Sequence, residues 1–233
     1  MNSQKSKLKI LAIHGFRQSD KIFSAKLGSL RKSFKKEVDF LFIKAPHKVP
    51  IENKSDCIEE PAENANEFEQ YGWWFNTEDK IFKATELSNK SVGFDESLEL
   101  VKNALLEQGP FDGILGFSQG GSFVSILCAM QQKNVLSSKF DFAIIISGFK
   151  SLCQPHQMFY DEQIMLPTLH VFGDSDKVIP TKMAKELSEL FVNKQVVLHD
   201  GGHYIPGKKH IYANFLKEMF EKKYINEKTN VFE

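Results

Sequence analysis

Apolar positions follow two patterns that alternate along this chain. Short, nearly unbroken apolar runs are typical of strands buried on both faces, and they occupy residues 8–13, 38–43, 111–115, 140–146, 168–172 and 195–198. Between them, apolar residues recur at helical spacing over residues 21–36, 92–106, 122–130, 183–191 and 211–220. Strands that alternate with helices predict βαβ units, here about six mainly parallel strands flanked by helices, joined by right-handed crossovers.

The alternation fails between residues 46 and 90. This segment contains Pro50, Pro61, many acidic residues and the run Tyr71-Gly-Trp-Trp-Phe75, with both tryptophans of the chain. An irregular stretch of this length inside a compact domain is uncommon and is usually functional or disordered. The two tryptophans argue against simple disorder.

Length and composition restrict the class of protein. The 233 residues are 42% hydrophobic and 26% charged, which predicts one globular domain, with a core at about 8–220 and a polar tail at about 222–233 that frays. Basic and acidic residues number 30 each, so the charge balance gives no basic surface for nucleic acid. No apolar run approaches the roughly 18 residues of a membrane span. No feature specifies an oligomeric state.

The cysteines and the N-terminus indicate a cytoplasmic protein. Cys57, Cys128 and Cys153 have no paired spacing, which argues against a disulfide framework or a zinc site and fits a reducing compartment. The first residues lack a signal-peptide pattern.

The candidate nucleophile is Ser118, in the run Gly116-Phe-Ser-Gln-Gly120. An apolar strand precedes this run and a helical pattern follows it, so the serine is expected on a sharp strand-to-helix turn. Flanking glycines let the strand and the helix approach closely, which leaves the serine Oγ exposed. The alternative is an ordinary glycine-rich turn with no catalytic role. It is less favoured, because a strand is predicted before the run and a helix after it.

A serine hydroxyl needs an adjacent base, which an acid in turn orients. Hydrolases built on such a sheet carry the three in the chain order serine, acid, histidine, at the carboxyl ends of strands. Asp174 and Asp176 both follow the fifth predicted strand. Asp174 adjoins Gly173 and is suited to holding the turn by local hydrogen bonds. Asp176, further into the loop, is favoured as the acid.

Seven histidines are candidates for the base. Three lie in predicted loops or in a helix and are expected at the surface: His47, His156 and His210. Two lie inside predicted strands, where a packed histidine is the simpler interpretation: His170 and His199. His14 adjoins the first loop and is expected to shape it. His203 follows the last strand in a glycine-rich loop and is the predicted base.

Two backbone N–H groups are candidates for an oxyanion hole, those of Phe16 and Gln119. Such a hole takes one N–H from the residue after the nucleophile and another from the loop after an early strand.

Five motifs together resemble a known family. They are His14-Gly-Phe-Arg-Gln-Ser19, Gly72-Trp-Trp-Phe75, Gly113-Ile-Leu-Gly-Phe-Ser-Gln-Gly-Gly121, Gly173-Asp-Ser-Asp-Lys-Val-Ile-Pro180 and Gly201-Gly-His-Tyr-Ile-Pro206. From about residue 8 to residue 220 the chain resembles the FSH family of serine hydrolases, which includes ovarian-cancer-associated serine hydrolases and fungal relatives. The resemblance implies an α/β-hydrolase fold without a large lid domain, and carboxylesterase or thioesterase activity on acyl esters.

The resemblance also implies a site. It points to the triad Ser118, Asp176 and His203, and it supports Phe16 and Gln119 as oxyanion donors. We expect an ester or thioester of a small molecule as substrate, and the chemistry needs no metal or organic cofactor. A non-catalytic ligand-binding module with the same fold is the alternative from another class.

Aromatic residues are candidates for an acyl pocket. Trp73, Trp74 and Phe75 are expected to line it together with the loop that carries Phe149 and Met158. An equally favoured interpretation is that the first three attach a long loop to the edge of the sheet. Clustered arginine or lysine is absent near the strand ends, which argues against strongly anionic substrates.

Overall fold

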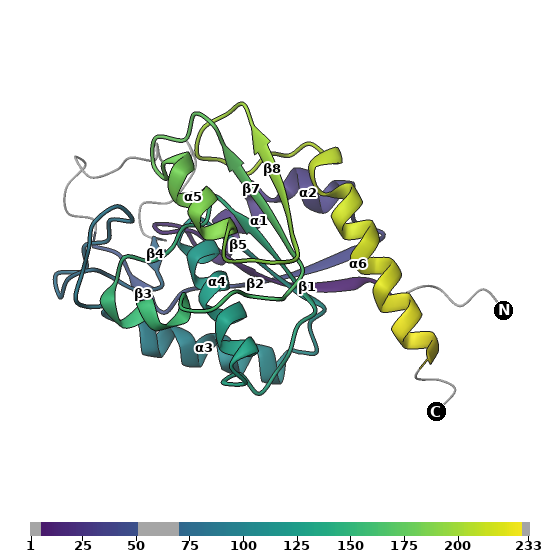
Figure 1. Ribbon diagram of the computed structural model, residues 1–233, viewed down its shortest axis with the longest axis horizontal. Coiled ribbons are helices and arrows are strands. Elements are labelled where there is room, and N and C mark those ends of the chain that lie inside the picture. Colours follow the sequence, from purple (N-terminus) through teal and green to yellow (C-terminus); the bar gives the residue numbers. More distant parts are fainter. Residues whose placement is uncertain (1–5, 51–69, 230–233) are drawn as a thin grey trace.

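The computed structural model describes residues 6–50 and 70–229, and a parallel sheet forms the centre of the molecule (Figure 1). The sheet contains β1 (Leu8–Ile13), β2 (Val38–Ile43), β5 (Gly113–Phe117), β6 (Phe142–Ile146), β7 (Thr168–Gly173) and β8 (Lys194–His199). Their order is β2-β1-β5-β6-β7-β8, and each neighbouring pair is parallel. The prediction of six parallel strands is therefore confirmed.

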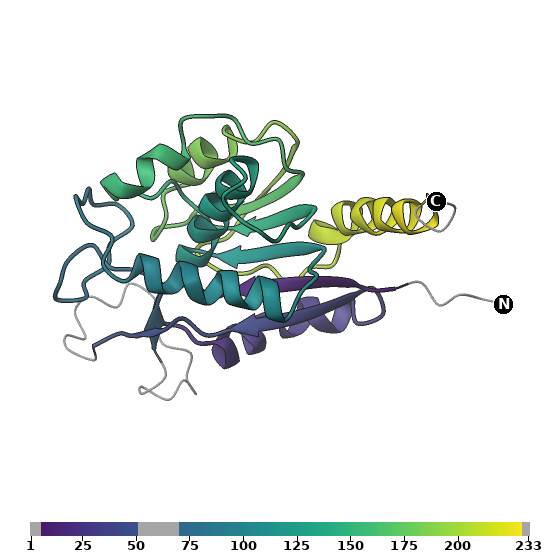
Figure 2. The same ribbon diagram turned by 90° about the horizontal axis from the view of Figure 1, so that it is seen from below.

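Helices cover both faces of the sheet, as Figure 2 shows. One face carries α1 (Asp20–Lys26), α2 (Gly28–Ser33) and α6 (His210–Thr229). The other carries α3 (Phe94–Glu107), α4 (Gln119–Gln132) and α5 (Thr181–Ser188). Two hydrophobic cores result, one on each side of the strands.

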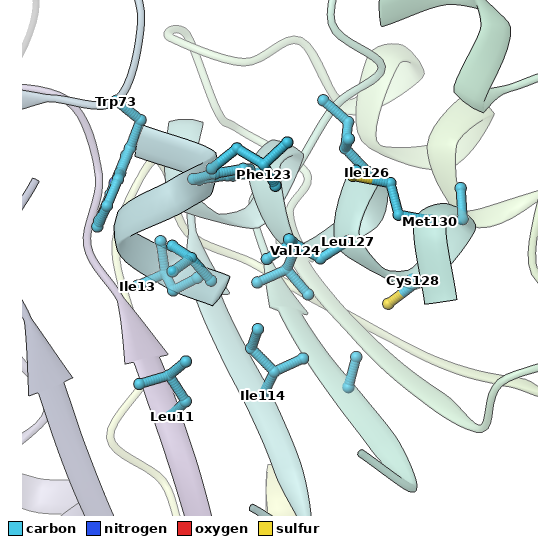
Figure 3. Close-up of a cluster of buried hydrophobic side chains, with 14 of the residues drawn as sticks. Leu11, Ile13, Trp73, Ile114, Phe123, Val124, Ile126, Leu127, Cys128 and Met130 are labelled. Atoms are coloured by element: carbon cyan, nitrogen blue, oxygen red, sulfur yellow. The ribbon is translucent and has the colours of Figure 1, made fainter. Parts of the chain in front are cut away.

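Strand β1 shows why these strands are apolar at nearly every position. Ile10 and Ala12 join the core under α1, α2 and α6, whereas Leu11 and Ile13 join the core under α3 and α4. Successive side chains of a strand point to opposite faces, so a strand covered on both sides needs apolar residues without alternation. Figure 3 shows Leu11 and Ile13 beside Val124 and Leu127 of α4.

The helix predicted over residues 21–36 is wrong in length. Two short helices form instead, and Leu27 between them has φ −81° and ψ 4°. Ser19 caps the first, since its Oγ accepts the N–H of Ile22 at 3.3 Å. Gly28 begins the second, and the Ser29 hydroxyl donates to the carbonyl of Gly207 at 3.1 Å. Glycine favours helices poorly, so the change of direction costs little there.

Helix α6 continues to Thr229, past residue 222, where the sequence predicts that the tail frays; residues 230–233 of that tail lie outside the described part of the chain. Lys223 bonds this part of the helix to other segments. Its Nζ donates to Asp112 Oδ2 and to the carbonyl of Lys7, each at 2.9 Å. These bonds attach the end of the helix to the start of β1. Within the described residues, no helix combines the length and apolarity that crossing a membrane requires.

The segment expected to be irregular contains a small antiparallel pair, β3 (His47–Lys48) and β4 (Tyr71–Gly72). Residues 51–69 of that segment lie outside the described part of the chain. After β4 the chain is irregular but internally bonded. The Asn76 side-chain amide donates to the carbonyls of Lys83 and Glu86 at 3.2 and 3.3 Å.

Two tyrosines lead to a stability prediction. Tyr212 is fully buried, and its hydroxyl has no hydrogen-bond partner in the described structure. Tyr212→Phe should therefore raise the free energy of unfolding by about 1 kcal/mol, because an unsatisfied polar group is removed. The Tyr160 hydroxyl instead accepts the N–H of Ser151 at 3.0 Å. Tyr160→Phe should lower the same free energy by about 1 kcal/mol.

Urea denaturation of both variants checks this prediction. Equal losses of stability in the two variants would contradict it.

Candidate active site

Ser118 lies on a strained turn between β5 and α4. Its backbone has φ 53° and ψ −118°, and a positive φ is unfavourable for a residue with a Cβ. The Ser118 N–H donates to the carbonyl of Ile146 at 2.9 Å, which ties the turn to β6. Its side chain makes no capping bond to α4, and the residue is 7% exposed. The turn thus leaves the hydroxyl without a capping role.

Gly120 allows this turn to form. A Cβ at Gly120 would overlap the carbonyl oxygens of Ile13 and His14 at the end of β1. The first turn of α4 therefore contacts the β1 backbone directly. Only glycine permits this approach without a shift of the main chain.

Asp176 and His203 form a hydrogen-bonded pair. Asp176 Oδ2 lies 2.7 Å from His203 Nδ1, and both side chains are almost fully buried. Asp176 Oδ1 accepts the N–H groups of Val178 and Ile179 at 2.9 and 2.8 Å. The carboxylate is thus held in place on one oxygen and orients the imidazole with the other.

Electrostatics keep Asp176 ionised. Burial by itself raises the pKa of this carboxyl. The hydrogen bond and charge of His203 and the N–H groups of Ile179 and Val178 outweigh that effect, and the pKa lies below its usual value. Asp176 therefore remains a hydrogen-bond acceptor at neutral pH.

Asp174 occupies a different environment. It is exposed, its carboxylate accepts the Ser175 hydroxyl at 2.9 Å, and its own N–H donates to the carbonyl of His199. The side-chain bond is local to the turn after β7, and the backbone bond joins that turn to the end of β8. Of the two aspartates after this strand, the structure brings Asp176 to His203.

Two contacts place His203 and the loop after β1 next to the Ser118 turn. The His203 ring lies 4.8 Å from the ring of Phe117, the residue directly before the serine. A Cβ at Gly15 would lie 3.4 Å from the Ser118 Cβ, so the backbone that leads into Phe16 adjoins the serine. Gln119 begins α4. The loops after β1, β5, β7 and β8 thus meet at the carboxyl edge of the sheet.

The residues predicted to line an acyl pocket divide into three groups. Trp73 and Trp74 are fully buried and pack against Phe123 of α4, so they attach the loop to the core and present no surface to a ligand in this conformation. Phe75 and Phe149 are also buried, within an aromatic cluster that is described below. Met158 lies in the 3₁₀ helix η2 (Gln154–Phe159) and is 59% exposed.

An aromatic cluster adjoins the Ser118 turn, and sequence reasoning missed one of its members. Phe82 lies 4.9 Å from the Phe16 ring and 6.4 Å from the Phe149 ring, and the Phe75 ring lies 6.1 Å from Phe16. Phe16 and Phe82 are partly exposed. Phe82 lies in the short run Lys80-Ile-Phe-Lys83, and no helical or strand periodicity of apolar residues includes it.

His156 corrects the surface prediction made for it. It is fully buried, 4.2 Å from the Phe94 ring and 5.2 Å from the Trp74 ring, with its Nδ1 2.8 Å from the Ser151 Oγ. Burial lowers the pKa of His156 to about 4. Its neighbours in the sequence, Pro155 and Gln157, do not mark it as buried. It is covered because η2 packs on α4 and because Phe94 of α3 and Trp74 lie against its ring. His170 is buried in β7, as expected.

Among the described side chains, no cluster of three or more histidine, cysteine, aspartate or glutamate residues is arranged to hold a metal ion. Cys128 and Cys153 are buried free thiols, and burial raises the pKa of both.

The chain is similar to known serine hydrolases and esterases. A family model described as "Serine hydrolase (FSH1)" matches residues 1–215. "Esterase OVCA2" of Danio rerio is 43% identical over 221 residues, which cover 91% of this chain and 97% of that protein. "Esterase C25G4.2" of Caenorhabditis elegans is 36% identical, with 96% and 99% covered.

Solved structures share the fold at low sequence identity. Esterase PE8 aligns with a TM-score of 0.61 and 19% identity, over 92% of this chain and 93% of that one. Acyl-protein thioesterase 2 of Zea mays aligns with a TM-score of 0.61 and 18% identity, over 94% and 96% of the two chains. At these identities the likeness concerns the α/β-hydrolase fold alone.

The glycine contact at β1 gives a prediction. Gly120→Ala should lower the free energy of unfolding by about 2 kcal/mol or more, because the new methyl group meets main-chain oxygens that cannot move away easily. Gly28→Ala is the matched control, since a Cβ there meets nothing within 4 Å and the residue lies in a helix. It should raise the same free energy by up to about 1 kcal/mol.

Thermal and urea denaturation measure both changes. A stable Gly120→Ala variant would show that the β1 and α4 backbones are not in the close contact described.

Proposed function

Because this chain belongs to the FSH1 serine hydrolase family and is a carboxylic ester hydrolase, we propose that it hydrolyses apolar acyl esters through a triad of Ser118, His203 and Asp176. The observation that carries the proposal is the buried Asp176–His203 pair next to the strained turn of Ser118. The order of the three residues along the chain is that of α/β-hydrolases.

The hydrogen bond to Asp176 determines which nitrogen of His203 acts as base. Since Nδ1 donates to the carboxylate, Nε2 takes the proton of Ser118. The serine oxygen then bonds to the ester carbonyl carbon. Nε2 returns the proton to the departing alcohol as the acyl-enzyme forms. Water attacks this intermediate with the help of the same base, and the carboxylic acid leaves.

Two backbone donors stabilise the negative charge that develops on the carbonyl oxygen. The N–H of Gln119 lies at the start of α4, where the helix dipole adds positive potential. The N–H of Phe16 follows Gly15, which adjoins Ser118. Loss of one such donor typically costs about 3 kcal/mol of transition-state stabilisation.

The aromatic cluster of Phe16, Phe75, Phe82 and Phe149 supports an apolar acyl group. Phe16 follows Gly15, which adjoins Ser118, and both Phe16 and Phe82 retain exposed surface. The buried rings of Phe75 and Phe149 pack against Phe16 and Phe82, respectively. An alkyl chain placed on Phe16 and Phe82 would lose contact with water. A thioester presents the same carbonyl to the same triad, so turnover of matched oxygen esters and thioesters measures the preference between them.

The free thiols support a reducing location. Cys128 and Cys153 are unpaired and buried. Such cysteines are usual in cytoplasmic proteins, and we assign the enzyme to that compartment.

Ser118→Ala should abolish covalent labelling by a fluorophosphonate probe and reduce ester hydrolysis by about a millionfold, to background, because no other group supplies the nucleophile. Ser122→Ala is the matched control, a buried serine one turn later in α4. It should retain both labelling and turnover. Labelling that survives in Ser118→Ala would refute the assignment of the nucleophile.

Asp176→Asn should lower kcat by about 10³- to 10⁴-fold, because the amide no longer holds His203 with Nδ1 as the donor. Asp174→Asn should stay close to the wild-type kcat, since the Asp174 carboxylate is exposed and bonds to the neighbouring Ser175 hydroxyl rather than to His203. Steady-state hydrolysis of a short-chain p-nitrophenyl ester compares the two. Equal losses would show that the acid was misassigned.

A further inference from the structure

We propose that Trp73, together with His14, positions the two oxyanion donors, so that the Gly72-Trp-Trp-Phe75 motif serves catalysis from within the core. Trp73 does not touch substrate in this role. It is a positioning residue that links the loop after β1 to the start of α4. The inference rests on the proposed function, because it takes the N–H groups of Phe16 and Gln119 as the donors.

Trp73 is bonded to both donor-bearing segments. Its backbone N–H donates to Gln119 Oε1 at 3.0 Å, and its indole N–H donates to the carbonyl of His14 at 2.7 Å. The Gln119 side chain closes the link, because its Nε2 donates to the carbonyl of Trp74 at 2.8 Å. One buried residue therefore sets the separation of the two segments.

His14 extends this link to the peptide that carries the Phe16 donor. Its Nε2 accepts the N–H of Ala45 at 3.0 Å, so the proton is on Nδ1, which donates to the carbonyl of Gly15 at 2.7 Å. Burial lowers the pKa of His14 to about 4, and the ring is neutral at physiological pH. The tautomer is thus determined by the protein.

The bond from His14 to the Gly15 carbonyl also orients the Phe16 N–H, because of the geometry of the peptide bond. The C=O of Gly15 and the N–H of Phe16 belong to one planar unit and point in opposite directions when the peptide is trans. Holding the carbonyl on His14 therefore fixes the direction of the Phe16 N–H. Because Gly15 adjoins Ser118, that direction matters at the reacting carbonyl.

Packing makes the arrangement rigid. Trp73 has no exposed surface, and its ring lies 5.5 Å from Phe123 and 4.9 Å from His14. Figure 3 shows it beside Phe123, over the end of β1 at Ile13. The Ser97 hydroxyl donates to the Trp73 carbonyl at 2.5 Å, so each polar group of Trp73 has a partner.

Trp74 is the natural comparison for Trp73, because it also fills the core but makes different hydrogen bonds. It is equally buried and packs on Phe94 and Phe123. Its indole nitrogen, however, has no nitrogen or oxygen partner among the residues that the structure describes. Two adjacent tryptophans thus share burial and differ in their hydrogen bonds.

The test compares Trp73→Phe with Trp74→Phe. Both substitutions remove an indole and keep an aromatic ring at a buried site. We expect kcat of Trp73→Phe to fall about tenfold or more below that of Trp74→Phe, with KM nearly unchanged, because the donors lose alignment. Inhibition by a trifluoromethyl ketone, whose serine adduct carries an oxyanion, should weaken in parallel. Thermal melting measures packing separately.

Equal kcat values and equal inhibition in the two tryptophan variants would overturn the inference, whatever their melting temperatures. The proposed function would stand in that case, provided that Ser118→Ala still abolishes probe labelling. If the probe fails to label the wild-type protein, or labels Ser118→Ala equally well, the proposed function is refuted instead.

A second pair decides the matter if Trp73→Phe does not fold. His14→Asn keeps a side-chain N–H two bonds from Cβ, as in Nδ1 of histidine, whereas His14→Leu keeps no donor. We expect kcat of His14→Asn to exceed that of His14→Leu about tenfold, again with similar KM values. Equal kcat values, or loss of folding in His14→Leu with inactive His14→Asn, would overturn the inference.

Discussion

The contact between the first turn of α4 and the end of β1 is the constraint on which the rest of the site depends. At Gly120 the helix backbone approaches the carbonyls of Ile13 and His14 so closely that no side chain fits between them. This approach brings Gln119 and the loop after β1 to the same place. Ser118, two residues before Gly120, has a positive φ in the same turn, which the flanking strand and helix hold.

Buried polar groups stabilise this crowded region. His14, Gln119 and Trp73 are fully buried, and the side chain of each bonds to the backbone of another segment: His14 to Ala45, Gln119 to Trp73, and Trp73 to His14. A buried polar group left unpaired costs free energy, so such a network favours one arrangement over others. The same bonds that make the fold specific also orient the peptides proposed to bind an oxyanion. If the proposal holds, stability and catalysis depend on the same contacts.

Much of the fold and of the candidate site follows from local patterns. The parallel strands were predictable because burial on both faces leaves continuous apolar runs, as at Leu8–Ile13. Strand ends then indicated Ser118, Asp176 and His203, since loops after parallel strands meet at one edge. Helix lengths were not predictable in the same way. The bonds of Lys223 to Asp112 and Lys7 join residues far apart in the chain, and no local pattern records them.

The sequence by itself determined the class of fold, the strained serine turn and the order of serine, acid and histidine, because each depends on neighbours along the chain. Only the tertiary structure decided that His156 is buried, that Phe82 packs against Phe16, and that Trp73 bonds to Gln119 and His14. These properties arise from side chains that meet across the sheet edge. Hydrophobicity shows that a tryptophan is buried, but its partners depend on which segments fold beside it.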